Sequence, residues 1–177
     1  MSEGTPAPKE HVLRDEIATR LANDGHTVTI EARAVAPGLF QRQAWRGMRA
    51  DLHVQLASGH PLHRVGLGVF VVECKRDDAN HKIKSSIGQA HDYMRAVRWR
   101  TGTHRNVGVY LPRPECALIC TPSMWTGRHD DADPWMLANE RIAWMHHAGW
   151  LVRRPGRSLA FRLRDDEPQR VIWERTR

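Results

Sequence analysis

Long apolar runs and cysteine are scarce in this chain of 177 residues, and each shortage excludes a class of protein. The clearest apolar run covers only residues 69–72, whereas a membrane-spanning helix needs roughly 18 or more apolar residues. Residues 1–9 lack the apolar segment of a secretory signal, so we expect a cytoplasmic protein that does not contact membranes. Three cysteines are too few for a disulfide framework, and the scattered histidines form no zinc-binding pattern.

Lysine is also scarce, because 23 of the 27 basic residues are arginine, and the formal net charge is +7. The planar guanidinium group binds phosphate through paired hydrogen bonds and stacks on aromatic rings, which suits a nucleic acid. A GC-rich genome would produce the same preference for arginine over lysine. Composition is therefore compatible with a polyanionic partner but does not establish one.

The hydrophobic fraction of 41% and the charged fraction of 27% are typical of a globular chain, and the length favours one domain. We expect a disordered arm over residues 1–8, which are small, polar and rich in proline, and one domain over residues 9–177. The core of this domain is expected over about 9–120, with a helix and hairpin extension over about 134–164.

Hydrophobic periodicity and turn residues predict the order of helices and strands. The nearly continuous apolar segment 66–74 indicates a central strand that is buried on both faces. The full prediction is helix 9–24, strands 26–33, 49–56 and 66–74, helix 85–100, strands 106–111 and 117–120, loop 121–133, helix 134–148, and hairpin strands 150–153 and 158–163. This order describes a mixed α/β domain whose central sheet is flanked by helices.

Asp51 is the only acidic residue between Ala32 and Val72. It lies on a predicted strand, in a stretch of sequence that is otherwise basic and partly apolar. Solubility does not require a single carboxylate in such a stretch, so Asp51 is a candidate functional residue. The alternative is an ion pair between Asp51 and Arg49 or Arg33.

Glu73 is the next acidic residue, and it ends the predicted central strand just before Cys74 and Lys75. Because side chains alternate along a strand, Glu73 and Lys75 share one face and Cys74 lies on the other. If the strands that carry Asp51 and Glu73 pair, the two carboxylates lie side by side, and Mg²⁺ or Mn²⁺ would relieve their repulsion. Lys75 could then orient and help deprotonate a water for attack on a phosphodiester. The alternative is a surface ion pair between Glu73 and Lys75.

Three short segments together resemble the PD-(D/E)xK nuclease superfamily. The segments RAD at 49–51 and VVECK at 71–75 resemble its active-site pattern, an Asp on one strand followed by (D/E)-x-K at the end of the next. The segment GQAHDY at 88–93 resembles the Q-x-x-x-Y helix element of RecB-like members. The resemblance covers about two thirds of the chain and implies a restriction-endonuclease-like or Holliday-junction-resolvase-like core. Ala50 stands where the family often has proline.

This resemblance implies an Mg²⁺-dependent endonuclease that hydrolyses DNA, with Mn²⁺ able to substitute. Asp51, Glu73 and the backbone carbonyl of Cys74 would be the metal ligands, and Lys75 would act on the nucleophilic water. Many members add an acidic residue from the first helix. Our candidate is Glu16, with the rivals Glu10 and Asp15; Glu16 could instead form a plain helical ion pair with Arg20.

The same resemblance implies that Gln89 and Tyr93 support the site or touch DNA; alternatively they are a solvated position and an aromatic residue at the edge of the core. Basic clusters at 95–113 and 153–164 could neutralise phosphates, or could simply be a solvated helix face and hairpin. The residues that we expect to contact DNA are Tyr93, Arg46, Arg49, Arg76, Arg98, Arg100, Arg154 and Arg157.

Two further functions stay open from the sequence, a non-catalytic DNA-binding or assembly protein on the same fold and a nuclease that acts on RNA. A chain with one site would need a homodimer to cut both strands of a duplex together. ATPase or helicase coupling is excluded in practice, because no G-x-x-x-x-G-K phosphate-binding loop is present.

Overall fold

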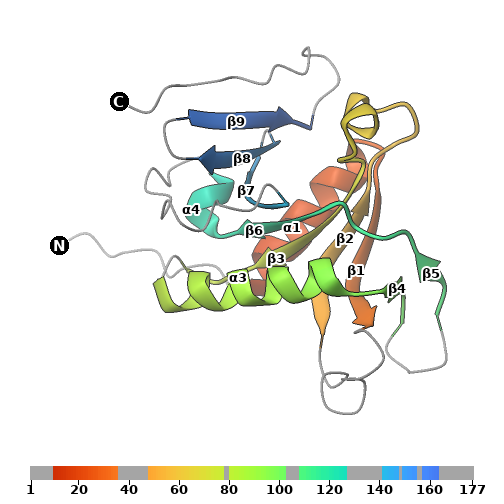
Figure 1. Cartoon of the computed structure of the whole chain (residues 1–177), viewed down its shortest axis with the longest axis horizontal. Helices are drawn as coiled ribbons and strands as arrows, with labels where there is room; N and C mark the ends of the chain where they lie inside the picture. The colour runs from red at the N-terminus through yellow and green to blue at the C-terminus, as the bar shows by residue number, and fades with distance from the viewer. Residues whose placement is uncertain are drawn as a thin grey trace.

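The structure is a computed structural model, and it describes residues 10–35, 48–77, 80–102, 108–126, 141–147, 149–154 and 157–163. Its helices and strands are α1 (Glu10–Asn23), β1 (Thr27–Val35), β2 (Arg49–Gln55), the 3-10 helix η2 (Pro61–Val65), β3 (Val69–Cys74), α3 (Asn80–Arg95), β4 (Arg98–Arg100), β5 (Tyr110–Leu111), β6 (Cys116–Cys120), α4 (Pro122–Trp125), β7 (Ile142–His146), β8 (Gly149–Arg154) and β9 (Arg157–Arg162). Figure 1 shows their arrangement.

The described strands form one nine-stranded sheet in the order β5-β4-β1-β2-β3-β6-β7-β8-β9. The central pairs β3–β6 and β6–β7 are parallel, and the remaining pairs are antiparallel. The sheet is therefore mixed, and the predicted α/β class with one central mixed sheet is confirmed. The expected C-terminal hairpin is present as β8 and β9.

The two long helices cover opposite faces of this sheet (Figure 1). On one face, α1 buries Leu13, Ile17 and Leu21 at helical spacing against side chains of β2, β3 and β6. On the other face, α3 buries Ile87 and Ala90 among others against the opposite side chains of the same strands. The central strand is thus buried on both sides, as its apolar sequence predicts.

The alternation of side chains breaks at the level of Asp51 on β2. Leu52 and Val54 pack in the cluster under α1, but Ala50, which would share their face in a regular strand, packs in the cluster under α3. On β1, Glu31 has a positive φ of 54° at the corresponding position of the antiparallel register. A local break of this kind re-aims the neighbouring side chains, and it lies beside the candidate site.

The predicted helix 134–148 is wrong where the structure describes it, because Ile142–His146 form strand β7; residues 134–140 lie outside the described residues. Four consecutive residues of this segment are buried, and β7 runs parallel to β6 inside the sheet. Such a strand is apolar throughout and lacks the alternation that distinguishes a strand from a buried helix in the sequence.

Three boundaries also differ from the prediction. The helix predicted over 85–100 runs from Asn80 to Arg95, and Arg98–Arg100 form β4 because this segment pairs with β1. Of the strand predicted over 106–111, the structure describes β5 at Tyr110–Leu111. The loop predicted over 121–133 begins with the short helix α4, whose first turn is capped by Thr121 Oγ1 accepting from Met124 N.

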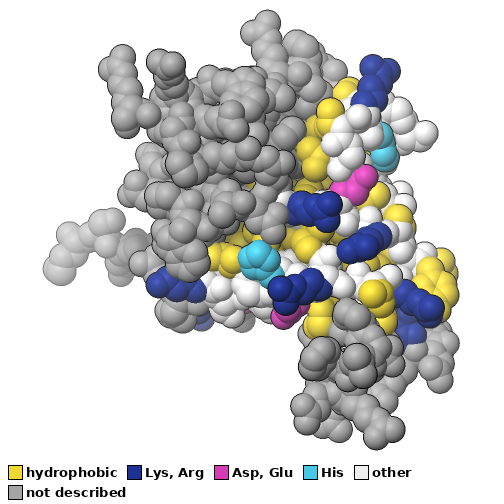
Figure 2. Space-filling model, viewed as in Figure 1, with side chains coloured by type: hydrophobic (Ala, Val, Ile, Leu, Met, Phe, Trp, Pro, Cys, Tyr) yellow, Lys and Arg dark blue, Asp and Glu magenta, His cyan; other side chains and the backbone are white. Residues whose placement is uncertain are grey.

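The face seen in Figure 2 carries many dark blue Lys and Arg side chains and few magenta Asp and Glu side chains on its described part. Dark blue and yellow side chains lie together at the right-hand edge, where Figure 1 places β4 and β5. Within the described ranges, no helix has the length and apolar character to cross a bilayer.

Candidate active site

Asp51 and Glu73 lie on neighbouring strands at the same level of the sheet. Asp51 is the third residue of β2, and Glu73 is the next-to-last residue of β3. The two strands are antiparallel with Leu52 opposite Val72, and Asp51 and Glu73 are the residues directly next to this last pair. The pairing that the sequence required for a two-carboxylate site is therefore present.

Glu73 and Lys75 form a buried ion pair rather than a surface one. Lys75 Nζ lies 2.6 Å from Glu73 Oε1, and the two side chains are only 14% and 5% exposed. Burial alone lowers the pKa of Lys75, but the charge of Glu73 and the hydrogen bond to it outweigh burial and raise that pKa. Lys75 is therefore a fixed ammonium group at the end of β3.

Tyr93 supports the same carboxylate from α3. Its hydroxyl lies 2.7 Å from Glu73 Oε2 and 2.5 Å from the carbonyl oxygen of Arg49, and the residue is 3% exposed. Burial and the adjacent charge of Glu73 raise the pKa of Tyr93, so the hydroxyl keeps its proton and donates it in a hydrogen bond. Of the two expected roles, this geometry supports a contact with the site and leaves no exposed ring for DNA.

Asp51 accepts a hydrogen bond from the backbone N of Cys74, with Oδ2 at 2.7 Å. Burial and the negative charge of Glu73 raise the pKa of Asp51 to about 7, although the Cys74 hydrogen bond acts in the opposite direction. The expected alternative partner Arg49 instead lies 3.1 Å from Glu31. Asp51 is thus a buried carboxylate whose charge the nearby Lys75 offsets only in part.

This donor set fits a hard divalent cation. The two adjacent carboxylates of Asp51 and Glu73 offer anionic oxygen ligands whose repulsion a cation would offset, which is the chemistry that Mg²⁺ and Mn²⁺ prefer. The Cys74 side chain packs in the cluster under α1, so its backbone carbonyl is the only ligand this residue could offer. Within the described residues, no group of three or more His, Cys, Asp and Glu side chains could hold a metal, so the ligand set would be two carboxylates with backbone or water oxygens.

Gln89 lies one helical turn before Tyr93 on α3. Its side chain is half-buried, and its Oε1 is buried without a hydrogen-bond partner within the described ranges. A buried acceptor of this kind is costly unless a ligand or water satisfies it, which is consistent with the supporting role expected for Gln89.

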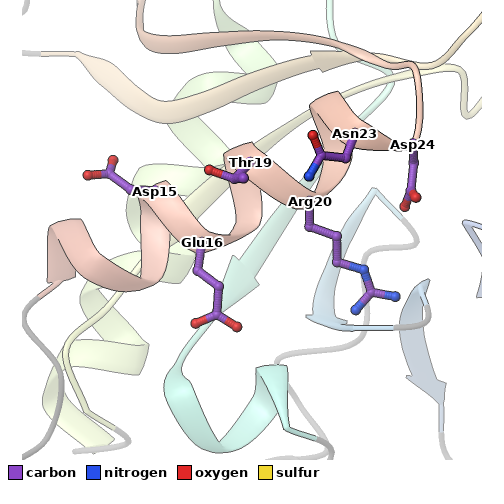
Figure 3. Close-up of a pocket in the computed structure, with 6 residues that line it drawn as sticks. All are labelled: Asp15, Glu16, Thr19, Arg20, Asn23 and Asp24. Carbon is purple, nitrogen blue, oxygen red and sulfur yellow. The ribbon is translucent and has the colours of Figure 1, made fainter.

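The first helix brings Glu10, not Glu16, to the lysine. Glu10 Oε1 lies 3.9 Å from Lys75 Nζ. Glu16 accepts a hydrogen bond of 2.7 Å from Trp125 Nε1, and Arg20 stacks over the same indole at 5.4 Å. Figure 3 shows Glu16 and Arg20 on the side of α1 that faces α4, where they line an open pocket with Asp15, Thr19, Asn23 and Asp24. Glu16, our first choice among the acidic residues of the helix, therefore contacts Trp125 and not the site. Its rival Glu10 contacts Lys75.

The described arginines that were expected to contact DNA lie on three separate segments of the chain. Arg76 is exposed directly after Lys75, and Arg98 is exposed on β4, whereas Arg100 is half-buried on the same strand. Arg49 is 46% exposed and pairs with Glu31, which also pairs with Arg14 of α1. The sequence analysis missed this network because Glu31 is far from Arg49 in the chain. Arg46 lies outside the described residues, as do the side chains of Arg154 and Arg157.

Comparison of the chain with protein-family models, curated proteins and solved structures finds no match in any of the three.

Proposed function

We propose that this protein is an Mg²⁺-dependent nuclease of the PD-(D/E)xK type that hydrolyses DNA phosphodiester bonds through an activated water. The observation that carries this proposal is the convergence of Asp51, Glu73 and Lys75 at the junction of β2 and β3. The order of α1, β1, β2, β3 and α3 with α1 and α3 on opposite faces supports a restriction-endonuclease-like core.

The chain's own residues have separable tasks in this proposal. Asp51 and Glu73 hold the cation, and Tyr93 fixes the orientation of Glu73 through its hydroxyl. Lys75 keeps its proton beside Glu73, so it orients the attacking water and stabilises negative charge on the phosphate rather than acting as a strong base. A bound divalent ion would lower the pKa of the attacking water and neutralise charge on the scissile phosphate.

A cleavage panel tests this proposal. Linear duplex, supercoiled, branched and single-stranded DNA are incubated with the wild-type chain in Mg²⁺, in Mn²⁺ and in EDTA. We expect cleavage in either metal and none in EDTA. Glu73→Gln, Asp51→Asn and Lys75→Ala should each reduce cleavage by at least about 100-fold with retained circular dichroism spectra, because each removes a group that acts at the reacting phosphate.

Arg64→Gln is the matched control, since Arg64 is exposed on η2 and has no place in the site. Unchanged cleavage in EDTA, or in the Glu73→Gln variant, would overturn the proposed mechanism. Binding without cleavage in either metal would favour a non-catalytic DNA-binding protein, and cleavage restricted to ribo-oligonucleotides would favour an RNA nuclease.

A further inference from the structure

Three arginines and a tyrosine stand in one row across four adjacent strands. The register places Arg33 of β1 opposite both Arg49 of β2 and Arg100 of β4, and Arg100 opposite Tyr110 of β5. Residues directly opposite each other in paired strands project from the same face of a sheet. With a strand spacing of about 4.8 Å, the row from Arg49 to Tyr110 is about 14 Å long.

The burial pattern fixes the face on which this row lies. The chain neighbours Ala32, Ala50, Trp99 and Leu111 all pack in or against the cluster under α3. Because side chains alternate, the four residues of the row project from the opposite face, on the side of the sheet that carries α1. None of the four belongs to the core cluster under α1.

A bound anion would reduce the repulsion within such a row of like charges. Like charges directly opposite each other destabilise a pair of strands, and here two successive pairs are arginine against arginine. The connecting segments 36–47 and 103–107 contain no acidic residue, and Glu31, which contacts Arg49, is already shared with Arg14. The Nε atom of the central Arg33 is buried and has no hydrogen-bond partner within the described ranges.

The outer end of the row is aromatic and open to solvent. Tyr110 is 69% exposed on the two-residue edge strand β5. The edge containing β4 and β5 is visible at the right of Figure 1. An exposed ring beside a basic track offers a stacking platform for a base, which requires that the base is not paired in a duplex.

We propose that this row binds an unpaired polynucleotide strand, with phosphates along Arg49, Arg33 and Arg100 and a base stacked on Tyr110. This inference rests on the proposed nuclease function and names its substrate class. The row begins at Arg49, two residues before Asp51 on β2, and Glu31 joins Arg49 to Arg14 of α1. A strand held on the row therefore comes within two residues of Asp51 along β2.

The test is binding of a short fluorescent oligothymidylate in EDTA, measured by anisotropy over a series of salt concentrations. Tyr110→Ala should weaken binding at least about fivefold, whereas Tyr110→Phe keeps the stacking ring and should bind like the wild type. Arg33→Gln and Arg100→Gln should each reduce the slope of log affinity against log salt by about 0.7. Arg64→Gln should change neither quantity, and thermal unfolding shows which variants are folded.

Because Tyr110 is exposed, the comparison of Tyr110→Ala with Tyr110→Phe tests the inference even if an arginine variant does not fold. Equal binding by Tyr110→Ala and the wild type, or tighter binding of a matched duplex than of the single strand, would overturn the inference. A ribo-oligonucleotide of matching sequence identifies which sugar the row prefers. Because EDTA removes the metal, a failure here with intact Mg²⁺-dependent cleavage refutes only the row, while intact binding without cleavage refutes only the proposed nuclease.

Discussion

At the scale of single residues, the site is defined by charges that the fold leaves incompletely balanced. Glu73 has two partners, the ammonium group of Lys75 and the hydroxyl of Tyr93. Asp51 has a backbone N–H and a like charge beside it. Removing a carboxylate from water is expensive, so such an arrangement is expected where a cation binds and not where stability alone matters.

Tyr93→Phe should weaken both folding and catalysis. The change removes the hydroxyl that contacts Glu73 Oε2 and the Arg49 carbonyl, so we expect a loss of about 1–3 kcal/mol in the free energy of unfolding. A displaced Glu73 should lower kcat about 10- to 100-fold and raise the Mg²⁺ concentration needed for half-maximal rate. Urea unfolding and Mg²⁺ titrations measure both effects, with the exposed Lys84→Gln on the same helix as the control. An unchanged Mg²⁺ requirement would show that Tyr93 is only a packing residue.

Asp51→Asn should stabilise the metal-free protein at neutral pH. The pKa of Asp51 is raised to about 7 in the folded state, above the unfolded value near 4, so wild-type stability falls as pH rises through this interval. At about 1.36 kcal/mol per pH unit, the variant gains up to about 4 kcal/mol over the wild type between about pH 4 and pH 7.

Urea unfolding of both proteins in EDTA across this pH range measures the difference in their free energies of unfolding. Added Mg²⁺ should reduce this difference, because it stabilises only the wild type. Asp24→Asn, an exposed carboxylate at the end of α1, is the control and should behave like the wild type at every pH. A constant difference between Asp51→Asn and the wild type from pH 4 to pH 7 would contradict the account of Asp51.

At the scale of elements, a helix or strand could be predicted from the sequence wherever one physical signal dominated. The apolar run of β3 and the helical spacing of Leu13, Ile17 and Leu21 on α1 predicted both elements within a few residues. Strand β7 could not be recognised, because a short buried apolar segment looks the same as a strand or as part of a helix. Its identity depends on β6 lying beside it, which is information from far along the chain.

The candidate site also has features that could be predicted from the sequence and features that could not. The pairing of the strands that carry Asp51 and Glu73 followed from the short connection between them, so it was predictable. The break in alternation at Glu31 and Ala50 was not, because it depends on which of two helices each strand segment packs against. The row of Arg33, Arg49 and Arg100 was equally hidden, since only the register brings these residues together.

The position of α1 leads to a prediction about two of its acidic residues, Glu10 and Glu16. Glu10→Gln removes the carboxylate 3.9 Å from Lys75 and should reduce cleavage a few fold with little effect on unfolding, as about 47% of the Glu10 side chain is exposed. Glu16→Gln weakens the hydrogen bond to Trp125 and should lower the free energy of unfolding by about 1 kcal/mol without changing cleavage. Cleavage rates and urea unfolding of the two variants provide the comparison. The reverse pattern would restore Glu16 as the helix acid of the site.

At the scale of the whole molecule, the distribution of charge is more informative than the net value of +7. Acidic residues are absent from residues 93–114 and reduced to Asp51 between 33 and 72, and both stretches contribute strands to the arginine row. In the proposed nuclease, a basic surface around a small acidic centre would attract the polyanion and hold the cation that cleavage needs. Cleavage of an unpaired strand needs one site, so the homodimer expected for double-strand cleavage is not a requirement of this proposal.

The most direct test of the central claim is the initial rate of single-stranded DNA cleavage as a function of Mg²⁺ concentration, for the wild type and for Glu73→Gln. We predict a saturable Mg²⁺ dependence for the wild type and a rate at least about 100-fold lower for the variant at every concentration. Equal rates for the two proteins, or a wild-type rate that does not respond to Mg²⁺, would contradict the assignment of Asp51, Glu73 and Lys75 as a nuclease site.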